Sequence, residues 1–314
     1  MIYTSLRIFL TILFLWLISI QIEWPSVIEI FLSIKWWWII VAILLQVLIF
    51  IIGAIRWWAF FCHGHSSYTL RQLIAPYFIG ALFNNFLPTS TGGDALRIYH
   101  IYKQGSDYSL AFSPIIVERA IGISVMFGVV SLIIPFIEFK VKWVQQFSIL
   151  IPAIFLALII LLSIIGCSRS YKTMHNFLTK KYNHKLIKTI LKITKSIHKY
   201  LKNPTLILQI ISLSVFAQFM EIIVFFTLSQ SIDAVIPFSN FILAVPIILI
   251  ITGLPISIGG FGIREIAIIT IFSTIGVSNL ESATIALLFI PVLIIGSSPG
   301  LYFFLNLKKN RSHS

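Results

Sequence analysis

Charged residues are scarce in this chain of 314 residues. They make up 11% of it, whereas soluble domains carry roughly 25%. Hydrophobic residues make up 58%, and the mean hydropathy is +0.99. No long stretch has an ordinary globular composition, which excludes a sizeable soluble domain. The composition indicates an integral membrane protein, with one membrane domain over residues 1–314.

Cysteine is also rare, because Cys62 and Cys167 are the only two. They are far apart and lie beside expected cytoplasmic loops, so we expect free thiols. His63 and His65 lie near Cys62 without a further cluster of metal-ligating residues, so the sequence predicts no metal site and no cofactor. The first apolar run has no small-residue cleavage site after it and is interpreted as a retained span.

Six apolar runs reach the length of about 20 residues that a membrane-spanning helix needs. They are Ser5–Ile22, Trp37–Phe61, Ala111–Ile137, Phe147–Gly166, Thr205–Gln230 and Ser282–Asn306. Two other regions, Arg71–Tyr108 and Phe238–Val277, consist of two apolar arms around a break rich in Pro and Gly. The arm Asp94–Ser106 would be about 20 Å long, short of the roughly 30 Å hydrocarbon layer. We therefore expect an all-α polytopic membrane protein with six full spans and two broken, re-entrant helical hairpins.

Basic residues give the chain an orientation, because Lys and Arg favour the cytoplasmic side. With the N-terminus inside, the inner side holds Arg7, Arg71, Lys103, the ten Lys and Arg residues of 169–202, Lys308, Lys309 and Arg311. The outer side holds Lys35, Lys140 and Lys142. The sequence thus predicts a multi-pass protein of the cytoplasmic (inner) membrane with both termini in the cytoplasm. This orientation holds whether each broken region is a re-entrant hairpin or two full spans.

The two broken regions resemble each other. The stretch "LPTSTGGDALR" from Leu87 aligns without a gap with "LPISIGGFGIR" from Leu254. Leu, Pro, Ser, two Gly and Arg coincide; Pro and Gly recur in any break, but the matched Ser and Arg favour an internal repeat. Because the hairpins enter from opposite sides, we expect an inverted repeat with units 37–137 and 204–306, a design of secondary transporters.

The second arm of each hairpin begins at the hairpin turn, so the positive ends of two helices point at the membrane centre. Helix N-termini bind phosphate and other anions, and glycines let a ligand approach the backbone. The residues predicted to bind a lipid phosphate are Asn84, Asn85, Ser90, Gly92, Gly93, Asp94, Arg97, Ser257, Gly259, Gly260, Gly262 and Arg264. Asp94 is equally consistent with a helix N-cap. Asn84 and Asn85 are equally consistent with satisfying the backbone opened by Pro88.

Several ionisable residues within the spans are predicted to interact with one another, since such groups are functional candidates by default. They are Glu118, Arg119, Glu221 and Glu265. Adjacent helix positions do not face each other, so Arg97 is expected to pair with Glu118, and Glu265 or Glu221 with Arg119. A purely structural ion-pair clamp between helices is the alternative.

Two isolated charges need separate interpretation. Glu221 stands mid-span in "FAQFMEIIVFF" and is either protonated or facing a water-filled cavity. Arg56 precedes Trp57 and Trp58, so we expect it to extend to the inner interface beside an aromatic belt.

The segment 167–203 is basic and includes "KKYNHKLIKTILKITKSIHKYLK", Lys180–Lys202. Its apolar residues are Leu186, Ile190, Ile193, Ile197 and Tyr200. The pattern predicts an amphipathic helix on the inner leaflet that contacts anionic lipids. It could act as a surface strap or gather anionic lipid for transport. Nucleic acid is not an expected partner, because the apolar face needs a membrane or a protein.

Three stretches resemble a known family: "NNFLPTSTGGDALRIY", "VERAIGI" and "LPISIGGFGIREIAI". They are similar to the characteristic stretches of the lysylphosphatidylglycerol synthase transmembrane region, or flippase-like domain family, which includes the membrane half of the multiple peptide resistance factor. In two-part relatives a cytosolic acyltransferase domain makes lysylphosphatidylglycerol, and the membrane region is thought to move that lipid outward. Because this chain ends at Ser314, we expect the synthase domain to be absent, which argues against lysyl transfer.

The resemblance implies a lipid translocase that moves an anionic, aminoacylated or polyisoprenyl-linked phospholipid across the inner membrane. Two alternatives stay open. One is a membrane-embedded lipid aminoacyl- or glycosyltransferase, for which Glu118, Glu221 and Asp94 are the available carboxylates. The other is a membrane partner of a lipid-modifying enzyme. The sequence indicates neither the lipid nor the oligomeric state.

Overall fold

The computed structural model describes residues 2–21, 24–63, 68–87, 92–136, 142–169, 171–173, 176, 185–253 and 256–311. Throughout these ranges the regular structure is helical, and no strand occurs in them. The predicted all-α polytopic architecture is therefore confirmed. Of the predicted positions, Pro88, Ser90, Leu254 and Pro255 lie outside the described residues.

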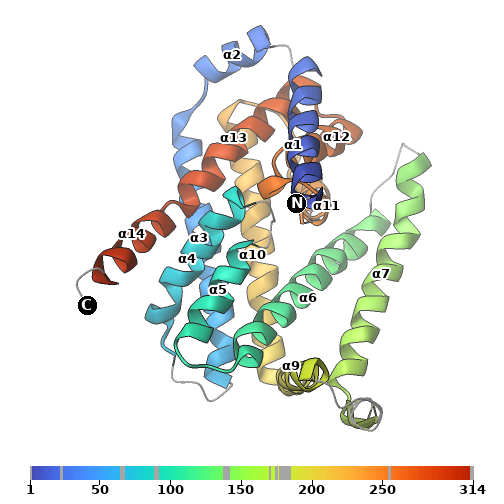
Figure 1. Ribbon diagram of the computed structural model, residues 1–314. Coiled ribbons are helices and arrows are strands. Elements are labelled where there is room, and N and C mark those ends of the chain that lie inside the picture. The colour runs from blue at the N-terminus through green and yellow to red at the C-terminus, as the bar shows by residue number, and fades with distance from the viewer. Residues whose placement is uncertain are drawn as a thin grey trace.

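The helices follow one another along the chain as shown in Figure 1. The first half contains α1 (Ile2–Gln21), α2 (Trp24–Leu32), α3 (Trp36–His63), α4 (Leu70–Phe86), α5 (Gly92–Lys103), α6 (Tyr108–Ile133), η1 (Ile134–Phe136) and α7 (Lys142–Gly166). The second half contains α9 (Lys185–Leu201), α10 (Pro204–Ser231), α11 (Phe238–Thr252), η2 (Ile258–Gly260), α12 (Ile263–Thr274), α13 (Asn279–Ser297) and α14 (Pro299–Arg311).

Five helical segments of the described chain are long and apolar enough to cross a membrane. They are Trp36–His63, Tyr108–Ile133, Ser148–Gly166, Pro204–Ser231 and Asn279–Asn306, and they correspond to five of the six predicted spans. The sixth prediction coincides with α1, a helix of 20 residues that exposes Phe9, Ile12 and Trp16. The last segment changes helix at Ser298, where α14 begins with Pro299, which lacks the N–H that an uninterrupted helix needs.

The centre of the molecule is formed by α3 and α10, which lie side by side (Figure 1). The largest apolar core surrounds this pair and includes residues of α11, α12 and α13. Phe225, Phe241 and Phe272 are fully buried there, and the rings of Phe225 and Phe289 stack with centroids 4.6 Å apart. In contrast, α7 stands at one side of the molecule, where it contacts α6 and α9.

The broken regions form two helical hairpins. The helices α4, α5, α11 and α12 have 17, 12, 15 and 12 residues. Their lengths of about 26, 18, 23 and 18 Å fall short of the roughly 30 Å hydrocarbon layer. In Figure 1 the α4–α5 pair occupies the lower half and the α11–α12 pair the upper half. This arrangement is compatible with re-entrant hairpins of opposite orientation, although the repeat units themselves stay a prediction.

The end of α4 contacts the second hairpin inside the molecule. A Cβ atom built on Gly259 would lie 2.1 Å from the carbonyl oxygen of Asn85, at the end of α4. Gly259 and Gly262 adopt φ angles of 57° and 83°, which favour glycine, and they turn the chain from η2 into α12. Glycine is therefore needed here for close contact between hairpins and for the backbone turn.

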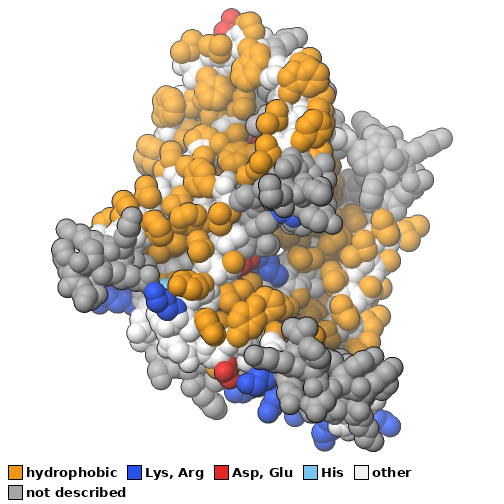
Figure 2. Space-filling model, in the orientation of Figure 1, with side chains coloured by type: hydrophobic (Ala, Val, Ile, Leu, Met, Phe, Trp, Pro, Cys, Tyr) orange, Lys and Arg blue, Asp and Glu red, His pale blue; other side chains and the backbone are white. Residues whose placement is uncertain are grey.

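The basic segment folds as predicted into an amphipathic helix, α9, at the lower end of the molecule. Leu191 and Tyr200 are buried, whereas Ile190, predicted for the apolar face, is 50% exposed. The Tyr200 ring packs edge-on against Phe60 of α3, and burial raises the pKa of its hydroxyl to about 12. Figure 2 shows Lys and Arg gathered at this end, below a mostly apolar surface. Cys62 carries a free thiol, as predicted.

Candidate functional site

The first hairpin places Arg97 against two carboxylates. Its Nη2 donates to Glu118 Oε2 at 2.7 Å and its Nη1 to Asp94 Oδ1 at 3.1 Å. Arg97 and Asp94 lie on α5 and Glu118 on α6, and all three side chains are buried. The predicted pair of Arg97 with Glu118 is confirmed.

Arg56 joins this group, contrary to the expectation that it extends to the inner interface. Its Nη2 donates to Glu118 Oε1 at 2.8 Å, and its Nη1 donates to Ser214 Oγ at 3.0 Å. Arg56 lies on α3 and Ser214 on α10, so the contact links three helices. The prediction was wrong because the Glu118 carboxylate approaches α3 within the bundle, and an ion pair inside the membrane outweighs access to water.

Arg119 also has a partner that differs from the predicted one. Its Nη2 donates to Asp94 Oδ2 at 2.7 Å, so the expected pairing with Glu265 or Glu221 was wrong. The reason is the rotation of α6, which turns Arg119 toward α5. Asp94 does not act as an N-cap, since α5 begins at Gly92 and Asp94 lies in its first turn. The Arg119 side chain is 48% exposed.

These five residues, Arg56, Asp94, Arg97, Glu118 and Arg119, form what we call the charge network. Three guanidinium groups against two carboxylates give it a formal charge of +1. Two aromatic rings pack against Arg97, whose Cζ lies 4.5 Å from the ring centroids of both Trp57 and Tyr77. A half-exposed arginine in a net positive group can bind an anion.

Other residues predicted to bind phosphate in the first hairpin connect α4 with α5 or with α13. The N–H of Gly93 donates to Asn84 Oδ1 at 2.7 Å, which ties the start of α5 to the end of α4. A Cβ on Gly93 would lie 1.8 Å from the Gly80 carbonyl oxygen, so helix packing fills the space beside it. Asn85 Nδ2 donates to Ser297 Oγ of α13 at 3.2 Å. Gly92 is partly exposed at the start of α5.

The second hairpin has a different arrangement. Arg264 Nη2 donates to the carbonyl oxygen of Gly259, and the N–H of Gly262 donates to Glu265 Oε2. The Arg264 guanidinium also lies over the rings of Phe261 and Phe289.

Several polar side chains of this hairpin and of the helices beside it are buried, and we call them the second-hairpin cluster: Gln46, Glu221, Ser257, Arg264 and Glu265. Glu221 lies within electrostatic reach of Arg264 and Gln46. Buried atoms without a hydrogen-bond partner occur here, namely Gln46 Oε1, Ser257 Oγ, Arg264 Nη1 and Glu265 Oε1. No ion pair of the described residues involves Glu221, Arg264 or Glu265. The residues predicted for one phosphate site thus fall into two groups, one on each hairpin.

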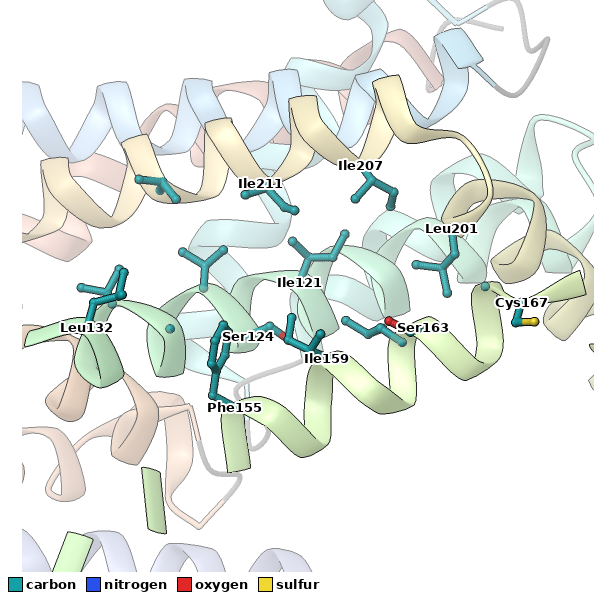
Figure 3. Close-up of a pocket in the computed structure, with 16 residues that line it drawn as sticks. Ile121, Ser124, Leu132, Phe155, Ile159, Ser163, Cys167, Leu201, Ile207 and Ile211 are labelled. Carbon is teal, nitrogen blue, oxygen red and sulfur yellow. The ribbon is translucent and has the colours of Figure 1, made fainter. Parts of the chain in front are cut away.

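An apolar groove lies between α6, α7 and α10, with Leu201 of α9 at one end. Its volume is about 660 Å³, and Figure 3 shows Ile121 and Ile211 facing each other across it, with Phe155 and Ile159 on the α7 side. Ser124 is one of its few polar members, and its hydroxyl donates to the Ala120 carbonyl at 2.8 Å. The lining suits a hydrocarbon chain better than a polar headgroup.

Several buried polar residues of these groups were not predicted from the sequence. Gln46, Gln218 and Ser214 are buried on α3 and α10, and Ser282 is buried on α13. A single polar residue in an apolar run was the available signal, most clearly Gln46 in "WWWIIVAILLQVLIF". Within the described residues, no group of three or more His, Cys, Asp or Glu side chains gathers as a metal site would require; His65 lies outside those residues.

Comparison with known proteins identifies the family of this chain. Residues 4–295 match the family described as the lysylphosphatidylglycerol synthase TM region. A UPF0104 membrane protein of Methanocaldococcus jannaschii is 25% identical over 303 residues, covering 91% of this chain and 89% of that protein. A UPF0104 membrane protein of Pyrococcus horikoshii is 32% identical over 88 residues, covering 27% of this chain and 26% of that protein. This multi-pass membrane protein therefore belongs to the lysylphosphatidylglycerol synthase transmembrane region family.

Proposed function

We propose that the protein binds the phosphate of an anionic membrane lipid at the charge network and moves that lipid across the membrane. The observation that carries the proposal is Arg119, whose side chain is 48% exposed within a network of formal charge +1. A bound phosphate balances that charge and accepts charge-assisted hydrogen bonds from the guanidinium. Membership of a family named for the membrane region of a lipid synthase supports a lipid-related role.

The depth of Arg119 supports movement of a headgroup through the bilayer. Arg119 lies 11 residues after Tyr108, the first residue of α6, which places it about 17 Å along the helix. That distance is close to half of the roughly 30 Å hydrocarbon layer. A phosphate at mid-depth has no water to solvate it, so a polar contact there lowers the barrier to crossing.

Open space adjoins Arg119 on the same helix. A Cβ on Gly122 would meet no atom within 4 Å, and Ile123 is 43% exposed. Figure 2 shows basic and acidic side chains together at mid-height of a mostly apolar surface. A headgroup can therefore approach the network from the side while the acyl chains stay in the bilayer.

The contact between the two hairpins could control which leaflet has access to the charge network. The end of α4 meets the second hairpin at Asn85 and Gly259, and broken helices that meet near the midplane are the usual place of alternating access in transporters. Relative movement at this contact would expose the charge network first to one leaflet and then to the other.

The proposal is tested by lipid transfer in proteoliposomes made with the purified full chain. A short-chain fluorescent phosphatidylglycerol is the substrate, and a membrane-impermeant quencher reports its leaflet. Wild-type protein should accelerate transfer over protein-free vesicles. Arg119→Gln should abolish this acceleration, whereas the same change at the exposed Arg71 should not. Equal transfer by wild-type protein and Arg119→Gln would show that the headgroup does not use the network.

A further inference from the structure

The second-hairpin cluster holds a buried excess of negative charge. Glu221, Glu265 and Arg264 are 8%, 1% and 5% exposed, so water solvates none of them well. Two carboxylates against one guanidinium give a formal charge of −1, opposite in sign to the charge network of the first hairpin. An unbalanced charge at such burial is costly. The cluster therefore requires a neutralising cation or proton.

Arg264 does not balance both carboxylates. Its Nη2 bonds the Gly259 carbonyl, its Nη1 has no hydrogen-bond partner, and no described basic side chain lies within 4.0 Å of Glu221 or Glu265. In the charge network, by contrast, each carboxylate contacts two guanidinium groups.

The helices around Glu221 bring few other charges. From α12 it faces Arg264, which also interacts with Glu265, and from α3 it faces the Gln46 amide. On α3 and α6, Arg56, Glu118 and Arg119 belong to the charge network, which reaches α10 at Ser214, two turns from Glu221.

The remaining contacts of α10 add no nearby cation. The helix α11 contains no ionisable residue, and the one acid of α13, Glu281, is bonded to Ser278 at the start of that helix. The basic helix α9 packs against the opposite end of α10, near Leu206 and Ile210.

A proton fits this cluster better than a metal ion. A hard cation needs a shell of oxygen ligands, whereas the cluster contains the Arg264 guanidinium, which repels cations. Of the two carboxylates, Glu265 accepts a hydrogen bond at Oε2 from the backbone N–H of Gly262, and this bond favours the ionised form of Glu265. Glu221 is therefore the better candidate for protonation.

We propose that Glu221 is a proton-binding site and that exchange of its proton is coupled to lipid movement. This inference rests on the proposed function. In the loading step a proton passes from hydronium to a Glu221 carboxylate oxygen and leaves water, and release reverses this step. A proton gradient would then supply the energy for transport.

The first test measures protonation without transport. Infrared spectra of the purified full chain in nanodiscs are recorded during a pH titration, and the carbonyl band of a protonated carboxylic acid is followed. Glu221→Gln should remove a band that persists in wild-type protein at neutral pH. Glu29→Gln, at an exposed acid of α2, should keep it. A wild-type protein without the band, or a Glu221→Gln protein that retains it, would overturn the proposal.

Stability distinguishes a proton site from a structural ion pair. A Gln at position 221 resembles a protonated Glu, so the unfolding midpoint should be unchanged. A clear fall in that midpoint would show that Glu221 is ionised and held by Arg264, and would contradict the inference.

The coupling is tested in proteoliposomes with an imposed pH gradient. The gradient should accelerate lipid transfer by wild-type protein and by Glu221→Asp, and the acceleration should be lost in Glu221→Gln. Equal acceleration in Glu221→Gln would refute coupling through this residue. If wild-type protein transfers no lipid at all, the proposed function and the coupling fail together, while the infrared band still decides whether Glu221 holds a proton.

Discussion

Glu118 is the residue on which the charge network depends most. It accepts hydrogen bonds from Arg56 and Arg97, which come from α3 and α5. Glu118→Gln would leave the buried Arg97 and the partly buried Arg56 short of a counter-charge, and breaking such a pair typically costs about 3–5 kcal/mol of stability. The unfolding midpoint in detergent should therefore fall strongly, and Glu29→Gln should leave it unchanged. Equal midpoints for the two variants would contradict this account of the network.

Gly93 illustrates a role that differs from the predicted one. The sequence associates it with phosphate binding, but the Gly80 carbonyl occupies the position where a side chain would begin. Gly93→Ala should therefore separate α4 from α5 and destabilise the fold. Gly122→Ala is the matched control, because that helical glycine has open space around it, and alanine favours helix by about 1 kcal/mol. Thermal unfolding of both variants checks this, and a stable Gly93→Ala protein would refute the packing role.

Residue-level pairing was only partly predictable from the sequence. Arg97 and Glu118 could be paired because both are charges within apolar runs, and such charges need partners. Arg119 was assigned the wrong acid because its partner depends on how α6 is rotated, which a single sequence does not specify. The depth of Arg56 depends in the same way on the packing of α3 against α6 and α10.

At the scale of elements, α9 offers a test through pH. Tyr200 is buried against Phe60, and its pKa is raised to about 12, against about 10 in the unfolded chain. Because the unfolded chain loses this proton first, stability should fall as pH rises from about 10 to about 12, by roughly 2–3 kcal/mol. Tyr200→Phe should remove this part of the decline in alkaline unfolding curves. An identical decline in wild-type protein and Tyr200→Phe would show that Tyr200 is ionised freely in the folded protein.

The helices were predicted correctly where their formation depends on the local sequence alone. Length and apolarity located five spans, and the lysine pattern located α9. The division of the last span at Ser298 was missed, although Pro299 was its sequence signal. The contact of Asn85 with Gly259 lay beyond prediction in detail, because residues 174 positions apart meet only through the packing of the two hairpins.

At the scale of the whole molecule, the orientation is open to a direct test. In a background lacking Cys62 and Cys167, Lys195→Cys should resist an impermeant thiol reagent in intact cells, and Val235→Cys should react. Both positions are exposed, and they lie at the predicted inner and outer ends. The reversed labelling pattern would invert the topology and remove the argument for two hairpins of opposite entry.

The central claim is that a lipid headgroup reaches the charge network, and photocrosslinking tests it most directly. A benzophenone amino acid at Ile123, one turn from Arg119, is activated in native membranes, and the adducts are identified by mass spectrometry. The same amino acid at Leu132, a strongly exposed residue of α6, reports ordinary bilayer contact. We predict adducts with anionic phospholipids at Ile123 that are lost in Arg119→Gln and kept in Arg71→Gln. Adducts at Ile123 with the same lipids and yields as at Leu132, unchanged by Arg119→Gln, would contradict the claim.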